Sequence, residues 1–191
     1  SFVNAGLLTL RQAIGVIMGA NIGTTMTAWI IAVFGFKADV SALAVPLMAL
    51  AFIFSISKKG KLRDISEVVA GFSLLFLGLS FMKSSVPNLQ NSPEVLSFIQ
   101  SWSGHGFWSV LSFVMVGTLL TLVLQSSSAT VALTLIFLNM GWIGFDMAAA
   151  MVLGENIGTT ITANIAAAVG NSNAKRAALA HTVFNLFGVI W

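Results

Sequence analysis

The sequence has few charged residues. Asp, Glu, Lys and Arg make up only 8% of its 191 residues, whereas 57% are hydrophobic. Soluble domains carry about 25% charged residues, so a chain this poor in charge cannot cover its surface with solvated groups. Its outer surface must therefore face lipid, which predicts a membrane protein. The formal net charge of +3 is small, and no nucleic-acid partner is expected.

Cysteine and tyrosine are missing altogether. Without cysteine there can be no disulfide and no thiolate-bound metal, and no transition-metal site is expected. No Asn-x-Ser/Thr glycosylation signal and no signal peptide are visible. These features favour a multi-pass protein of the bacterial inner membrane, that is, its plasma membrane. Both ends of the sequence lie inside apolar stretches, and we expect it to be part of a longer protein.

Apolar stretches separated by short polar segments predict an all-α, polytopic membrane protein. A helix needs about 20 residues to cross the hydrocarbon core. Two of the stretches are short and are separated by the polar run Gln125–Ser128, which predicts a re-entrant helical hairpin. The stretches are Ala13–Phe36, Val40–Ile56, Val68–Met82, Phe107–Leu124, Ala129–Ile143 and Met147–Val169, and a further one begins at Ala177.

Basic residues predict the orientation in the membrane. The densest positive cluster, Lys58–Arg63, is expected in the cytoplasm. One crossing later Pro87–Gly106 is expected outside, and the hairpin returns the chain to the outside at Asp146. The next crossing brings the basic pair Lys175–Arg176 to the cytoplasm. Counting backwards from the cluster places Arg11 inside as well.

A long internal repeat is the most informative feature. Residues 2–35 align without gaps with residues 137–170, and each copy contains Gly-x-Asn-Ile-Gly-Thr-Thr-x-Thr-Ala. Arg11 aligns with Asp146, and the predicted orientation places these two residues on opposite sides. The copies are therefore expected to cross in opposite directions, as in secondary transporters built from inverted repeats with broken transmembrane helices.

The repeat also predicts the domain organisation. A single transmembrane transporter domain is expected over residues 1–191. Within it, we expect part of repeat 1 at 1–56, a connecting segment at 57–106 and part of repeat 2 at 107–191.

The glycine-rich motifs Gly19–Thr25 and Gly154–Thr160 have two interpretations. Their GxxxG spacing is typical of a helix-packing face. However, packing needs small residues rather than an Asn and several Thr, which favours a binding role. Paired glycines weaken a helix, and we expect these segments to unwind. Freed carbonyl oxygens and Thr hydroxyls would suit a hard cation such as Na⁺.

The run Gln125–Ser128 is either an ordinary polar turn or an anion site, and the motif alone does not decide between them. A serine run at a helix start offers N–H and hydroxyl donors, and the helix dipole favours an anion there. The apolar stretches hold Lys or Arg only at their ends. A bound anion would need co-bound cations, which predicts coupled binding of an anion and Na⁺.

Four further polar residues are candidates for a functional role. Glu155 lies deep in an apolar stretch, where a carboxylate costs about 3 kcal/mol to insert, and a functional and a structural role are equally favoured. For His105, His181 and Asn185, solvation or packing is favoured over function.

The chain has three features in one combination: Gln125-Ser-Ser-Ser, two copies of Asn-Ile-Gly-Thr-Thr, and the order of these motifs. In this combination it resembles the type II sodium-dependent phosphate cotransporter family, in its bacterial form. The resemblance extends over nearly its whole length. The resemblance implies a transporter rather than an enzyme, which imports inorganic phosphate with Na⁺ as coupling ion and needs no other cofactor. That family has a Gln-Ser-Ser-Ser hairpin in each repeat. The second such motif is expected upstream of Ser1, and a homodimer is left open.

The resemblance also implies the site residues. Phosphate would bind at Gln125, Ser126, Ser127, Ser128, Asn21 and Asn156. Sodium would bind at Gln125, Ser126, Thr159, Thr160, Thr162, Thr24 and Thr25. Glu155 would serve in coupling or in structure.

Three other functions compete with this one. A related transporter could carry another anion, such as a dicarboxylate. An intramembrane hydrolase could use one of Ser126–Ser128 with His181, although no acid that would orient this histidine is evident. A structural membrane subunit would have no use for polar repeats at membrane depth.

Overall fold

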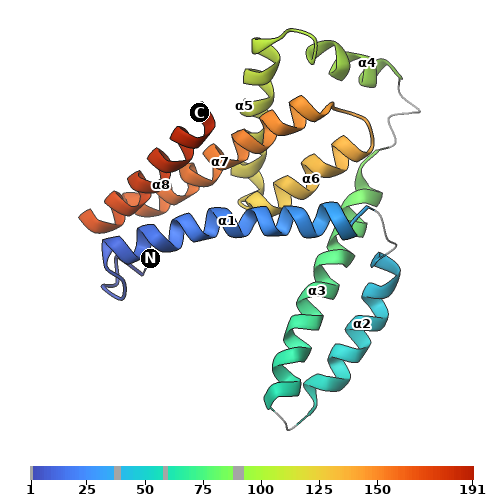
Figure 1. The fold of residues 1–191 in the computed structure, drawn as a ribbon, viewed down its shortest axis with the longest axis vertical. Helices are drawn as coiled ribbons and strands as arrows, with labels where there is room; N and C mark the ends of the chain where they lie inside the picture. Colours follow the sequence, from blue (N-terminus) through green and yellow to red (C-terminus); the bar gives the residue numbers. More distant parts are fainter. Residues whose placement is uncertain (1, 37–39, 58–59, 88–92) are drawn as a thin grey trace. The chain divides into compact units, whose positions relative to one another are not determined.

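The computed structural model of the protein describes residues 2–36, 40–57, 60–87 and 93–191, and every regular element in these ranges is an α-helix (Figure 1). The helices are α1 (Leu10–Phe34), α2 (Val40–Ser55), α3 (Gly60–Ser85), α4 (Pro93–Trp102), α5 (Phe107–Leu124), α6 (Ser127–Asn139), α7 (Phe145–Ala168) and α8 (Ser172–Ile190). The all-α class is confirmed. Lys58 and Lys59, on which the predicted orientation partly depends, lie outside the described residues.

Three of these helices, α1, α3 and α5, are long and apolar enough to cross a membrane. The apolar helices α2 and α6 are shorter. Each predicted apolar stretch corresponds to one helix, but α3 begins earlier than expected and includes Lys61 and Arg63. Helix α4 was missed, because Pro87–Gly106 was interpreted only as an external segment. Its start has a recognisable signal, since Pro93 occupies the first helical position.

The prediction that the glycine-rich motifs unwind is wrong. Helices α1 and α7 run without interruption through Gly19–Thr25 and Gly154–Thr160. An unwound turn would leave backbone groups without partners in apolar surroundings, where each one costs several kcal/mol. A glycine lowers the stability of a helix by only about 1 kcal/mol relative to alanine, so the helix persists. The described backbone breaks instead at Gln125–Ser126, between α5 and α6.

The chain divides into two compact units, Trp29–Asn88 and Ser1–Ala28 with Leu89–Trp191. In the first of these, α2 packs along α3. Small or short side chains at the contact, including Ala44, Ala51 and Ser73, are buried and let the helices approach closely. The Lys83 ammonium donates a hydrogen bond to the Gly35 carbonyl just after α1, where the helix dipole favours a cation.

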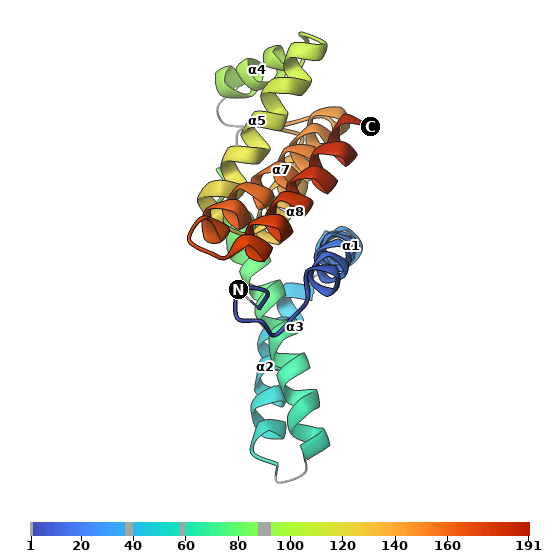
Figure 2. The same ribbon diagram turned by 90° about the vertical axis from the view of Figure 1, so that its left-hand side faces the viewer.

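In the other unit, α7 is the central helix and contacts α5, α6 and α8. Figure 2 shows α7 beside α5 and α8. One apolar core cluster of this unit consists of Met147, Ala148 and Met151 together with Ile143. The Phe137 ring at the end of α6 stacks on the nearby Trp142 ring, with ring centroids 4.8 Å apart. This core fixes α7 against the α5–α6 pair, which carries the polar run singled out in the sequence.

The N-terminal segment of the same unit is joined to the start of α8 by two asparagines. The Asn4 side chain accepts a hydrogen bond from the Asn171 backbone N–H at 2.7 Å. Asn171 in turn caps α8, because its side chain accepts from the Ala174 N–H at 2.9 Å. The residues before α1 therefore meet the end of the second sequence copy.

Candidate functional site

The break between α5 and α6 is made by two residues of unusual backbone conformation. Gln125 adopts the left-handed conformation, with φ 53° and ψ 27°, and its N–H bonds the Thr121 carbonyl at 2.8 Å. Ser126 is extended and caps α6, since its hydroxyl accepts from the Ala129 N–H at 3.2 Å. The Thr130 hydroxyl donates to the Ser126 carbonyl at 2.9 Å and closes the turn. A helix–break–helix therefore lies at the predicted position.

The first turn of α6 offers hydrogen-bond donors. Ser127 and Ser128 are its first two residues and are half-buried, while Gln125 is exposed. Helix geometry leaves the N–H groups of the first turn without partners inside the helix. The serine run and the helix start thus coincide, which is the arrangement that can hold an anion.

Glycines make the contact between α5 and α7 unusually close. A Cβ atom at Gly154 would overlap the Val114 carbonyl, and one at Gly117 would overlap the Met151 backbone. A Cβ atom at Gly158 would lie 2.7 Å from the Thr121 Cβ. The GxxxG spacing in α7 is therefore a helix-packing face, which was the alternative that the sequence interpretation favoured less.

A row of polar side chains is buried where α5, α6 and α7 meet. Its members are each at most 2% exposed: Thr121, Thr130, Thr134, Glu155 and Thr160. The Thr134 hydroxyl donates to Glu155 Oε1 at 2.7 Å. Thr121 Oγ1 and Glu155 Oε2 have no hydrogen-bond partner among the described residues. Thr121 and Thr134 were not identified from the sequence, although hydroxyls in otherwise apolar helices were a signal.

The predicted sodium ligands on α7 all bond to their own helix. The Thr159 hydroxyl donates to the Glu155 carbonyl, Thr160 to Ile157 and Thr162 to Thr159, at 2.8 to 2.9 Å. Each hydroxyl uses its proton in this way and keeps oxygen lone pairs for another partner.

The contact of Thr121 with Gly158 brings the break toward these threonines. Gln125 is one turn beyond Thr121, and Thr162 is one turn beyond Gly158, each about 6 Å further along its helix. The structure therefore joins the α5–α6 pair and the α7 motif in one packed region.

The residues predicted on α1 do not join this region. Asn21 donates a side-chain hydrogen bond to Asn185 on α8 at 3.3 Å. The Thr24 and Thr25 hydroxyls donate to carbonyls of their own helix. Within the described ranges, no hydrogen bond connects α1 with Gln125–Ser128. Asn185 was expected only to pack, and it is buried and links two helices.

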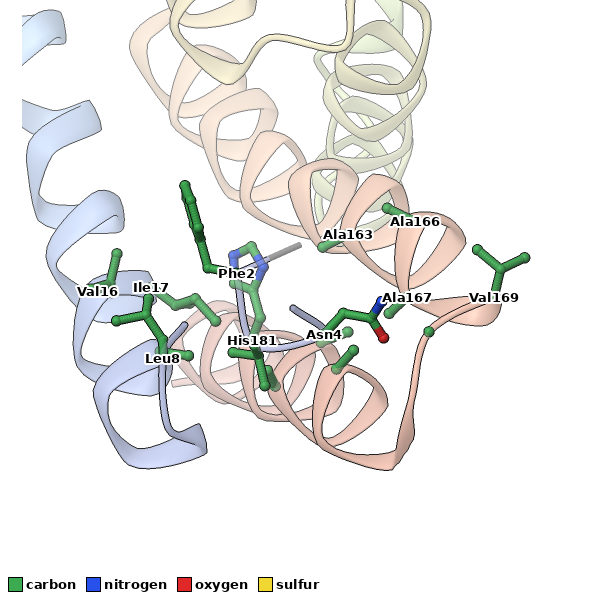
Figure 3. Close-up of a pocket in the computed structure, with 16 residues that line it drawn as sticks. Phe2, Asn4, Leu8, Val16, Ile17, Ala163, Ala166, Ala167, Val169 and His181 are labelled. Atoms are coloured by element: carbon green, nitrogen blue, oxygen red, sulfur yellow. The ribbon is translucent and has the colours of Figure 1, made fainter. Parts of the chain in front are cut away.

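A cavity of about 470 Å³ lies elsewhere in the unit, between the N-terminal segment, α1, α7 and α8 (Figure 3). Its walls are mainly apolar and include Phe2, Ile17 and Ala163, with Asn4 and His181 as polar members. None of the predicted phosphate or sodium residues lines it. His181 lies here, and no hydrogen bond within the described ranges joins it to Ser126–Ser128.

Comparison with known proteins gives consistent results. The family model described as Na⁺/Pi-cotransporter matches residues 1–84 and 97–191. The uncharacterized protein YqeW of Bacillus subtilis (strain 168) is 34% identical over 191 residues, which are 98% of this chain and 58% of that protein. The putative inorganic phosphate export protein YjbB of Escherichia coli (strain K12) is 28% identical over 98% of this chain and 33% of its own length.

A human relative matches part of the chain. The sodium-dependent phosphate transport protein 2C of Homo sapiens is 39% identical over 97 residues, which are 49% of this chain and 15% of that protein. No solved structure matches. The chain spans only about a third to somewhat over half of the length of the bacterial relatives named above. With the family model matching almost all of its residues, the chain belongs to the Na⁺/Pi-cotransporter family.

Proposed function

We propose that the whole protein is a secondary active transporter that imports inorganic phosphate together with Na⁺ across the bacterial inner membrane. The observation that carries this proposal is the family match, which includes both glycine-rich motifs and the Gln125–Ser128 break. The relatives' names support phosphate as the transported ion. One name says export and another says sodium-dependent. Import is proposed because an inwardly directed Na⁺ gradient would drive coupled phosphate in the same direction, into the cell.

The α5–α6 pair would enter and leave the membrane on the same side. Helix α6 has 13 residues and is therefore about 20 Å long, whereas the hydrocarbon core is about 30 Å thick. It is too short to cross alone. A re-entrant hairpin would place the break and its donors at depth, where irregular backbone is tolerated against protein or water. The hairpin would belong to repeat 2, and residues 1–56 to an inverted repeat 1.

Phosphate would bind at the start of α6, through Gln125, Ser126, Ser127 and Ser128, with Asn156 on α7 and Asn21 on α1. Helices α5, α6 and α7 contain no Lys or Arg. A phosphate among neutral donors alone would be very costly to desolvate, so co-bound cations are required. Their proposed ligands are oxygens of Gln125, Ser126, Thr159, Thr160, Thr162, Thr24 and Thr25.

The test is phosphate uptake by the full-length protein reconstituted in vesicles, with an inward Na⁺ gradient or with choline in place of Na⁺. Ser127→Ala should lower uptake at least about tenfold, because one hydrogen bond to a charged group contributes roughly 1.5 to 3 kcal/mol. Thr160→Ala should lower the apparent Na⁺ affinity. Ser97→Ala, at an exposed position on α4, is the matched control and should behave as the unaltered protein.

Two outcomes would contradict the proposal. Undiminished uptake in choline would exclude Na⁺ coupling. Preference for a dicarboxylate over phosphate in competition would instead favour a transporter of another anion within the same architecture. Vesicles sorted by orientation, with the Na⁺ gradient in either direction, decide between import and export.

A further inference from the structure

Glu155 is a carboxylate enclosed in the middle of α7. It is 1% exposed, and only one of its two oxygens has a hydrogen-bond partner among the described residues, the Thr134 hydroxyl. A buried carboxylate is stable only when it is paired or neutralised. If the carboxylate is ionised, it therefore needs a compensating ligand at Oε2, where no hydrogen-bond partner lies among the described residues.

The elements packed on α7 supply no compensating cation. Helices α5 and α6 contain no ionisable side chain. On α8, Lys175 and Arg176 are exposed in the first turn, and His181 lies on the cavity beside Ala163. Ala163 is eight residues beyond Glu155, or about 12 Å along α7. No basic side chain of the described part forms an ion pair with this carboxylate.

A second polar group without a partner lies on the facing helix. Thr121 on α5 is 1% exposed, and its hydroxyl oxygen has no partner among the described residues. Its Cβ packs against Gly158, which is three residues after Glu155 and therefore on the same side of α7. Buried polar groups nearly always have partners, and two exceptions in one helix contact point to a ligand that both would share.

We propose that Glu155, Thr134 and Thr121 form a Na⁺ site of their own, distinct from the phosphate-linked site at Gln125–Ser128. All the available ligands are oxygens, which hard cations prefer. Thr134 donates its proton to Oε1 and keeps its lone pairs for the cation. The aligned residue in the first sequence copy is Ala20, so only the second copy contains this site. The proposal rests on the proposed Na⁺ coupling and adds a further ion site to it.

The carboxylate makes this site separable from the phosphate-linked one. The ligands of the phosphate-linked site are neutral, so Na⁺ there needs phosphate for charge balance, whereas Glu155 supplies a negative charge of its own. Na⁺ should therefore bind at Glu155 without phosphate. Because a ligand that binds only the folded state stabilises it, Na⁺ should raise the melting temperature of the purified full-length protein in phosphate-free detergent solution.

The experiment compares melting temperatures in NaCl, KCl and choline chloride at equal ionic strength. The unaltered protein should show a Na⁺-specific increase, and Glu155→Gln should abolish it. Glu94→Gln, the same substitution at an exposed position on α4, should retain it. Thr134→Val and Thr121→Val preserve side-chain shape and should shift the increase to several-fold higher Na⁺ concentrations. If Glu155→Gln does not fold, these two variants test the Na⁺ site in its place.

The site is excluded if the unaltered protein shows no Na⁺-specific increase, or if Glu155→Gln or both valine variants retain it unchanged. These outcomes would exclude the Na⁺ site at Glu155 without contradicting the proposed phosphate transport. Conversely, Na⁺-independent phosphate uptake would refute the proposed function even where phosphate-free Na⁺ binding is observed.

Discussion

The two copies of the glycine-rich motif have the same sequence pattern but different surroundings. In α7, Gly154 and Gly158 press against the backbone of α5. In α1, a Cβ atom at Gly19 or Gly23 would meet nothing within 4 Å in the described part of the chain, and Ile22 between them is 69% exposed. The motif therefore does not determine its own environment. What differs is a partner helix with small residues at matching positions.

The sequence repeat indicates where such a partner would come from. Helix α5 precedes α7, and the offset of 135 residues between the copies places its counterpart upstream of Ser1. We expect that segment to include the second Gln-Ser-Ser-Ser. It would cover the glycine face of α1 as α5 covers that of α7.

The largest difference between the two copies is expected in the accessibility of their first residues to a thiol reagent outside the cell. If the copies are inverted, a cysteine at Leu7 lies inside and one at Phe145 outside. Both positions are well exposed, and the chain has no other cysteine. An impermeant thiol reagent on whole cells should label Phe145→Cys and leave Leu7→Cys unlabelled until the cells are opened. Labelling of both on whole cells would show that the copies are not inverted.

A smaller effect is expected from adding one methyl group to each motif. Gly154→Ala should lower the free energy of unfolding by about 1 to 3 kcal/mol, because the Cβ meets the Val114 carbonyl. In the full-length protein, Gly19→Ala should cost a similar amount if its face has an equivalent partner. Thermal unfolding in detergent measures both.

Gly188→Ala is the control for these variants. It lies in α8, and no atom of the described part lies within 4 Å of the added Cβ. Alanine at this position should stabilise the helix by up to about 1 kcal/mol. If Gly19→Ala behaves like this control, α1 has no counterpart of α5.

The smallest effect is expected at the contact of the first copy with α8. Asn21→Ala removes one long hydrogen bond to Asn185 and should cost about 0.5 kcal/mol. Asn185→Ala should cost more, because Asn185 is buried and also donates to the His181 carbonyl. A double-mutant cycle isolates the contact, and a coupling energy near zero would show that α1 is held to α8 by other contacts.

Several features of this fold follow from the sequence alone. Apolar stretches indicated seven of the helices, and the polar run at Gln125–Ser128 indicated the break between α5 and α6. Both are local properties, since hydropathy and turn-forming residues act within a few positions. The start of α6 was expected near Ala129 and lies at Ser127, because Ser126 caps the helix.

Contacts between helices could not be predicted in the same way. Thr134 bonds to Glu155 across 21 residues, and Asn4 bonds to Asn171 across 167. Nothing in the local pattern says which helix faces which. The unwinding prediction failed for a different reason, because it considered the low helix propensity of glycine and not the larger cost of leaving backbone groups unpaired in apolar surroundings.

Gln125 is the one described residue other than glycine with a positive φ. A side chain in this conformation costs roughly 1 kcal/mol or more, and glycine would relieve the strain. Selection for stability alone would therefore replace it. If Gln125 belongs to the proposed phosphate site, a glutamine at the break between α5 and α6 lowers stability in return for binding, and engineering for thermal stability should leave that position unchanged.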